Sequence, residues 1–298
     1  QLKIGEQDVL SAQGDYRQTN AVFLPNIRAS HTGMATTNPL MAFGFRLNQE
    51  IVTQADFDPN SLNNPSQINM FATKFEIEQP IFNLDGIYQR KAAKAKLDAT
   101  QLQLDRTEDY MVFEAEKAYM QLQVAYKSVE VLQTALEAAQ DNLRMATNSF
   151  DQGYLQHSDV LAVKVRVTEV ENQLQYAKSN IRNASEYLAV LMNEKVEGVL
   201  QPMDALNVQA EWTIDQQLPE TRADLQAMEL AAEAYKQNHK ADQMSFLPRL
   251  NAFGSYELYD DQIFQGGANG YLFGAALTWD IFEGSKRLGK SKKSKAEL

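Results

Sequence analysis

The chain of 298 residues contains no cysteine and only three histidines, His31, His157 and His239. Without thiols the chain cannot form a disulfide, a thiolate metal site or a cysteine nucleophile. The histidines lie far apart in the sequence, and there is neither a phosphate-binding glycine loop nor a nucleophile motif. We therefore expect no catalytic residue, no cofactor and no metal, and an enzyme is the least supported class of protein.

Long apolar runs are missing as well. No stretch reaches the roughly eighteen apolar residues that a transmembrane helix requires. The N-terminus lacks a basic-then-apolar signal peptide, so the signal of an exported protein would lie outside these residues. The net charge is -11, and the acidic residues are spread along the chain. A nucleic-acid partner is disfavoured, because it requires a clustered basic face.

Alternating apolar and polar residues predict four β-strands. Residues 71–81 place phenylalanine and isoleucine on one face and Lys74, Glu76 and Glu78 on the other. Residues 271–281, which include Asp280, repeat this pattern, as do residues 250–258 and, more weakly, residues 27–33. Strands of about ten residues cross a bilayer when tilted. The aromatic residues on the apolar faces favour contact with lipid, and the opposite faces would then meet water. A soluble β-sandwich is the alternative.

Apolar residues at a three-four spacing predict a long antiparallel helical hairpin over residues 115–146 and 160–191. Gly153 lies at the turn, and Ser158 is a suitable N-cap for the returning helix. Helices over about 86–150, 159–193 and 222–245 would be about 97, 52 and 36 Å long at 1.5 Å per residue. The second and third helices together nearly retrace the length of the first, so the chain returns close to the level at which the first helix began.

The sequence also contains an internal repeat. Phe-Leu-Pro occurs at residues 23–25 and again at 246–248, each time before a predicted strand. Proline ends a helix because it lacks an N–H and has a fixed φ. Each Phe-Leu-Pro segment is therefore expected to mark a change from a helix to a membrane hairpin at the same height.

Several motifs resemble the outer-membrane factor family, the TolC-type exit ducts of efflux pumps and type I secretion systems. They are the paired Leu-Pro segments at 24–25 and 247–248, Gln-Pro-Ile-Phe-Asn at 79–83, Trp-Asp-Ile-Phe-Glu-Gly at 279–284, and Ser-Phe-Asp-Gln-Gly at 149–153 followed by Ser-Asp-Val-Leu at 158–161. The resemblance implies a mixed membrane α+β fold in a homotrimer. Each chain would give four strands to one twelve-stranded β-barrel, continued by a barrel of coiled-coil helices.

The resemblance also implies a location and partners. The duct would lie in the outer membrane of a Gram-negative bacterium with a large periplasmic part, contacting lipid, a periplasmic adaptor and an inner-membrane pump of the RND, ABC or MFS type. Its expected parts are the end of a periplasmic helix (1–22), a transmembrane hairpin with a long extracellular loop (23–82), a periplasmic helical hairpin with its tip near 151–158 (83–195), an equatorial segment (196–221), a periplasmic helix (222–245), a second transmembrane hairpin (246–283) and the start of a truncated last helix (284–298).

Two groups of site residues follow from the resemblance. Gln152, Gly153 and Tyr154 correspond to the tip that contacts the adaptor. Ser158 and Asp159 are candidates for the periplasmic gate. The alternative for this pair is a helix start, with serine as the cap and aspartate favoured by the helix dipole, and both roles can hold together. The second helical tip and its gate partner would lie outside this chain.

Basic residues follow both predicted membrane hairpins, and we interpret them as contacts to anionic headgroups. The alternative is a solvated helix start. The residues concerned are Arg90, Lys91 and Lys94 after the first hairpin and Lys286, Arg287 and Lys290 after the second.

Taken together, these patterns predict a passive exit duct of a tripartite efflux or type I secretion system, with Lys74, Glu76, Glu78 and Asp280 facing its lumen. The alternatives are a periplasmic adaptor and a structural coiled-coil protein without a membrane barrel. Neither alternative accounts for four strands of membrane length. Drug efflux, metal efflux and protein secretion share this type of duct, so the sequence selects no cargo.

Overall fold

The computed structural model describes residues 1–204, 206 and 221–298. The chain divides into two compact units. One unit comprises Lys3–Leu104 together with the chain from residue 221 onward, and the other centres on residues 105–204. Helix α4 (Leu84–Asp151) contributes its first part to one unit and the remainder to the other. Each unit is described by itself below.

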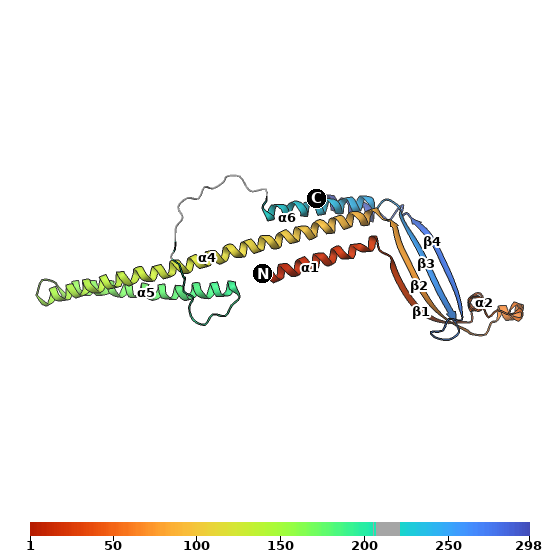
Figure 1. The fold of residues 1–298 in the computed structure, drawn as a ribbon, viewed down its shortest axis with the longest axis horizontal. Helices are drawn as coiled ribbons and strands as arrows, with labels where there is room; N and C mark the ends of the chain where they lie inside the picture. The colour runs from red at the N-terminus through yellow and green to blue at the C-terminus, as the bar shows by residue number, and fades with distance from the viewer. Residues whose placement is uncertain (205, 207–220) are drawn as a thin grey trace. The chain divides into compact units, whose positions relative to one another are not determined.

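The first unit contains a four-stranded antiparallel sheet in the order β1-β2-β3-β4 (Figure 1). Its strands are β1 (Asn26–Thr36), β2 (Ile68–Phe82), β3 (Arg249–Asp260) and β4 (Ala268–Thr278). The central pairing of β2 with β3 joins two hairpins that are far apart in the sequence, with Phe75 opposite Tyr256. The four predicted strands are confirmed, and β1 and β3 both start at the same end of the sheet.

One strand ends earlier than its alternation predicts. β4 stops at Thr278, which pairs with Arg249, so the prediction of a strand through residue 281 is wrong. The next residue on β3's side is Pro248, which has no N–H to continue the ladder. Trp279 instead donates its indole N–H to the carbonyl of Phe246 at 2.9 Å.

Helices join the sheet at one end, where Figure 1 places α1, α4 and α6. They are α1 (Leu2–Gln18), continued by a 3-10 turn η1 (Thr19–Val22), the start of α4, α6 (Ala223–Met244) and α7 (Lys286–Glu297). Their buried positions are mostly alanine: Ala12, Ala92, Ala95, Ala99, Ala227, Ala234 and Ala241. Alanine leaves little side chain between the backbones, so these helices can approach one another closely.

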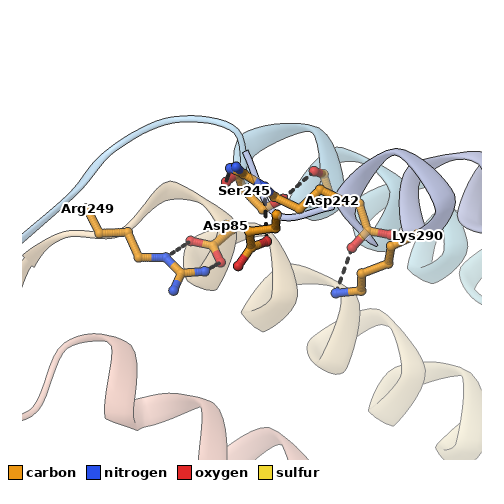
Figure 2. Close-up of polar contacts among 7 residues, drawn as sticks. Asp85, Asp242, Ser245, Arg249 and Lys290 are labelled. Atoms are coloured by element: carbon orange, nitrogen blue, oxygen red, sulfur yellow. Dashed lines mark hydrogen bonds and ion pairs between the residues drawn. The ribbon is translucent and has the colours of Figure 1, made fainter. Parts of the chain in front are cut away.

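Two ion pairs lie near the end of the sheet where the helices begin, one between a strand and a helix and one between two helices (Figure 2). Arg249, the first residue of β3, donates to both carboxylate oxygens of Asp85 in the first turn of α4, at 3.3 and 2.5 Å. Asp85 is only 6% exposed. Lys290 of α7 pairs with the buried Asp242 of α6 at 2.8 Å. The first pair connects the second hairpin to the helix that follows the first hairpin.

The second unit is the helical hairpin of α4 and α5 (His157–Met192). The predicted three-four seam is confirmed, because Ala118 and Leu122 of α4 form a core with Ile181 and Leu188 of α5. Beyond α5, Leu200 donates its N–H to Ser185 Oγ at 2.7 Å and accepts from the hydroxyl of Tyr126 at 3.0 Å. Most of the expected equatorial segment, residues 205 and 207–220, lies outside the described residues. Among the helices that the structure describes, none combines the length and hydropathy needed to cross a membrane.

The segment between β1 and β2, residues 37–67, is called the insertion here. It contains α2 (Pro39–Asn48), a 3-10 turn η2 (Gln54–Phe57) and α3 (Pro59–Asn63). Asn38 caps α2 by accepting from Met41 N at 3.2 Å. Asp56 accepts from the N–H and the hydroxyl of Thr53 at 2.7 and 2.9 Å, and pairs with Arg46 at 2.5 Å. The long loop expected in this region is therefore an ordered helical element.

We predict that Arg249→Met destabilises the sheet unit by about 1–3 kcal/mol, because the buried Asp85 carboxylate loses its charged partner. The control is Lys94→Met, which breaks the exposed Lys94–Asp98 pair at 2.7 Å and is expected to cost less than about 1 kcal/mol. Thermal unfolding followed by circular dichroism in detergent compares the two variants. Equal shifts in melting temperature would contradict the prediction that the buried Arg249–Asp85 pair stabilises the protein more than the exposed Lys94–Asp98 pair.

We also predict that acid loosens the insertion. The hydrogen bonds from Thr53, and then the charge of Arg46, lower the pKa of Asp56. A group with a lowered folded-state pKa contributes stability above its unfolded pKa, near 4, and loses it as pH falls through the folded value. Amide protection at residues 53–57, corrected for intrinsic exchange, should therefore fall below about pH 4. Asp56→Asn should remove this dependence, whereas Glu50→Gln, an exposed control on the same segment, should retain it.

Candidate functional site

The sheet has one face rich in charge, called the polar face here. Register places Lys74, Glu76 and Glu78 of β2 on this face, as alternation predicts. Lys74 Nζ lies 2.8 Å from Glu76 Oε1 and 3.2 Å from Glu257 Oε1 of β3. Asn251 donates to Glu78 Oε1 at 2.8 Å. Polar side chains of the two hairpins therefore contact each other across the β2–β3 pairing at two places.

The structure adds residues to this face that the sequence analysis does not single out. Arg28 stands opposite Glu76, and Ser30 opposite Lys74, while Glu257 completes the row on β3. The sequence pattern that could have predicted them is charge at alternate positions of β1 and β3. This pattern is weak, because serine and phenylalanine interrupt the charged residues. Asp280 does not join the face, because it lies beyond the end of β4; its backbone carbonyl accepts from Arg287. Its assignment to the strand is corrected accordingly.

A glycine stands opposite an aromatic residue at one point of the polar face. Gly274 of β4 pairs with Phe253 of β3, and a Cβ at position 274 would stand 2.8 Å from the ring carbon Cζ of Phe253. The ring therefore lies over the glycine, where a side chain would displace it. On the opposite face, Phe71 lies over Gly33 in the same manner.

The opposite face, called the apolar face here, exposes large side chains. Tyr271 and Phe273 are both 77% exposed, and Ile27, Phe75 and Leu277 are exposed as well. Apolar area of this extent on a soluble monomer marks an interaction surface. Aromatic and aliphatic residues on one face with charge on the other are the pattern of a membrane β-barrel, polar inside and apolar outside.

The tip of the helical hairpin contains Gln152, Gly153 and Tyr154. Gly153 has φ +82°, and its N–H bonds to Phe150 O at 2.8 Å, while Tyr154 N bonds to Ser149 O at 2.9 Å. These two bonds form a Schellman motif, which favours glycine at this position because its φ is positive. Tyr154 is 79% exposed and lies outside the helix. The tip therefore presents an aromatic ring to solvent.

The start of α5 differs from the prediction. The helix begins at His157, so Gln156 is the N-cap and Ser158 is not. Asp159 Oδ2 accepts from Gln156 N at 2.9 Å. This bond satisfies a free N–H at the helix start and places a carboxylate at the positive end of the dipole. Ser158 and Asp159 are both exposed.

Both arginines proposed to contact headgroups are engaged within the chain. The guanidinium of Arg90 lies 4.3 Å from the ring centroid of Tyr16 and bonds to Thr19 Oγ1 at 3.1 Å. Arg287 pairs with Glu283 at 3.1 Å and bonds to Ser245 O at 3.0 Å. Of the lysines, Lys94 and Lys290 pair with Asp98 and Asp242. Headgroup contact stays a prediction, best suited to the exposed ammonium groups of Lys91, Lys94 and Lys286.

The same contacts recur at both Phe-Leu-Pro segments. Arg90 lies 5.7 Å from the ring of Phe23, and Arg287 lies 5.1 Å from the ring of Phe246. The side chain of Gln79 donates to Phe23 O at 2.9 Å, as the indole of Trp279 does to Phe246 O. Gln79 and Trp279 each stand two residues before an Ile-Phe pair. The repeat therefore extends from the sequence to the contacts that turn the chain.

The described part of the chain contains no group of three or more histidine, aspartate or glutamate side chains that could hold a metal ion. His31 stacks between Phe71 and Phe264, with ring centroids 6.0 and 4.4 Å away. His239 bonds to Ser294 Oγ at 3.0 Å.

Comparison with known proteins agrees with this architecture. A family model described as outer membrane efflux protein matches residues 1–194. The chain is similar to the crystal structure of CusC, with a TM-score of 0.81 and 15% identity over 99% of this chain and 66% of that chain. It is similar to VceC from Vibrio cholerae (TM-score 0.79, 17% identity, 99% and 68% covered) and to the CmeC outer membrane channel of Campylobacter jejuni (0.78, 17%, 99% and 61%).

The chain spans about two thirds of the length of these solved structures. No curated protein matches it. The solved structures share the fold of the chain, and the family consists of channels rather than enzymes. The family model covers well over half of the residues, including both strands of the first hairpin and both helices of the coiled coil. The chain therefore belongs to the outer membrane efflux protein family.

Proposed function

We propose that the chain is one subunit of a homotrimeric exit duct, which carries cargo passively from the periplasm across the outer membrane of a Gram-negative bacterium. The observation that carries this proposal is the four-stranded sheet with a charged polar face and an exposed aromatic apolar face. Closing such a sheet into a barrel turns the apolar face to lipid and the polar face to water. Lys74, Glu76, Glu78, Arg28 and Glu257 then line the lumen.

The number of copies follows from the strand count. The sheet has two edges, β1 and β4, that no other described strand pairs. In a bilayer an unpaired edge is too costly, so β4 of one copy pairs with β1 of the next until the barrel closes. Two copies supply eight strands, a barrel whose interior side chains fill. Three copies supply twelve strands and are the smallest assembly with an open lumen.

The remaining parts follow the division expected from the sequence. Residues 23–82 and 246–283 form the membrane hairpins, and 1–22, 83–195, 222–245 and 284–298 lie in the periplasm. The expected equatorial segment, 196–221, falls largely outside the described residues. Gln152, Gly153 and Tyr154 contact a periplasmic adaptor, which connects the duct to an inner-membrane pump of the RND, ABC or MFS type in a tripartite efflux or type I secretion system. The chain itself makes and breaks no bonds, so direction and energy come from the pump.

We expect the complete mature protein, extracted from outer membranes in detergent, to be a trimer of its own subunit mass. Size exclusion with light scattering, corrected for bound detergent, measures that mass. A monomer that stays in solution without detergent would contradict the barrel and favour a periplasmic adaptor or a structural coiled coil. Partition into the outer-membrane fraction, rather than release by osmotic shock, is the accompanying control.

The gate proposed at Ser158 and Asp159 is tested separately. If the Asp159 charge holds the periplasmic end closed, Asp159→Asn and Asp159→Ala both raise the closed-state conductance in planar bilayers. Asparagine retains an acceptor for Gln156 N, whereas alanine also removes a cap worth about 1 kcal/mol. Ser158→Ala shows whether the hydroxyl contributes. A normal closed state in Asp159→Asn would assign Asp159 to helix capping alone.

A further inference from the structure

Helix α2 of the insertion packs against the sheet at the end remote from the helices, and the rest of the insertion extends beyond the strands (Figure 1). Helix α2 contacts both β2 and β4 and lies at that end in Figure 1. Ala42 and Phe45 are its buried apolar residues. On the sheet, the buried residues at this end are Met70 of β2 and Ala268 of β4. By register, Met70 and Ala268 share the face of Lys74 and Glu257, so α2 covers the polar face.

The opposite face is covered by a different segment. The turn between β3 and β4 brings Phe264 over His31, and a Cβ on Gly266 would stand 3.2 Å from the side chain of Leu258. His31 and Leu258 belong to the apolar face by register with Thr73. The two connections thus separate at this end of the sheet, with the insertion on the polar face and the short turn on the other.

Polar contacts hold the insertion in place. The buried side chain of Gln49, just after α2, donates to the backbone oxygen of Asn69 at 2.7 Å and lies 3.4 Å from that of Asp260. Arg46 pairs with Asp56, and the rings of Phe43 and Phe57 meet edge to face at 5.7 Å. The insertion is therefore attached to β2 and β3 and stiffened internally.

One side of α2 is apolar and uncovered in the single chain. Leu40 is 83% exposed and Leu47 51% exposed. Between them, a Cβ added to Gly44 would meet no atom within 4 Å, so the surroundings of this glycine are open. At 100° per residue, Leu40, Gly44 and Leu47 form a stripe opposite Ala42, Phe45 and Gln49. This stripe points away from the sheet.

We propose that the Leu40–Gly44–Leu47 stripe packs against the same stripe of the other two copies and forms an apolar constriction at the outer mouth of the duct. The inference rests on the proposed function, since barrel closure turns the polar face inward and carries α2 into the lumen. Inside the barrel, the surfaces that α2 can meet are those of the other copies and of the cargo. A stripe of leucines facing water in an otherwise charged lumen is stabilised when its equivalents cover it.

The partner is therefore a second copy of this chain, and its contact continues the interface made by the strand edges. Leucine at the narrowest point also supplies a hydrophobic barrier, which hinders water and ions without any charge. The constriction belongs to the sheet unit, whereas the gate residue Asp159 belongs to the other unit.

Disulfide trapping tests this contact, because the chain has no cysteine of its own. Leu47→Cys in the complete trimer is oxidised in outer membranes and analysed without reductant, beside Asn63→Cys on the exposed surface of α3 as the control. We expect inter-chain disulfide dimers from Leu47→Cys and none from Asn63→Cys. Leu40→Ser combined with Leu47→Ser should raise the conductance several-fold, measured in the Asp159→Asn background so that the other gate does not limit it.

Light scattering on the same samples distinguishes failure of the constriction from failure of the proposed function. A trimer in which Leu47→Cys forms no inter-chain disulfide overturns the constriction and leaves the duct intact. A protein that is not a trimer overturns the proposed function itself. Because Leu40 and Leu47 are exposed in the single chain, their substitution leaves the subunit's own core unchanged.

Discussion

Every backbone N–H and C=O inside a bilayer must find a partner, and the sheet of this chain can meet that requirement only by joining other sheets. Pairing of β2 with β3 unites hairpins from distant parts of the sequence, but it leaves β1 and β4 at the edges. Barrel closure therefore requires several copies, and the two sides of the sheet acquire different surroundings at the same moment. In the proposed barrel, the charged residues around Lys74 face water and the exposed rings of Tyr271 and Phe273 face lipid.

The same closure constrains the helices. Both strand pairs must begin at one level, where the helices end and the proposed barrel starts. Phe23 and Phe246 meet this demand in parallel ways: an arginine lies over each ring, and a side-chain N–H bonds to each carbonyl. Arg90 and Arg287, which the sequence suggests as lipid contacts, are structural residues at these corners. The ion pair of Arg249 with the buried Asp85 then joins the two hairpins on the helical side of the sheet.

Local periodicity predicts much of this fold, since strand alternation and the three-four helical spacing each depend only on neighbouring residues. Lys74, Glu76 and Glu78 fall on one face for that reason. Contacts between distant residues leave no such periodic trace. Alternation predicts a strand through residue 281, because nothing in that segment reveals that Pro248 ends the ladder. Ser158 resembles a cap by residue type, whereas Asp159 reaches back to Gln156. The insertion lacks a clear period, because its helices are short and its anchor is a single side chain, Gln49.

The glycine at position 274 bears on the width of the proposed lumen. The ring of Phe253 occupies the space where a side chain at position 274 would stand. If the polar face lines the duct, a larger residue at 274 would tilt the ring toward the axis. The passage would then narrow without any change in its charge. Members of a family built this way could adjust the size of what passes by substituting a residue that the cargo never touches.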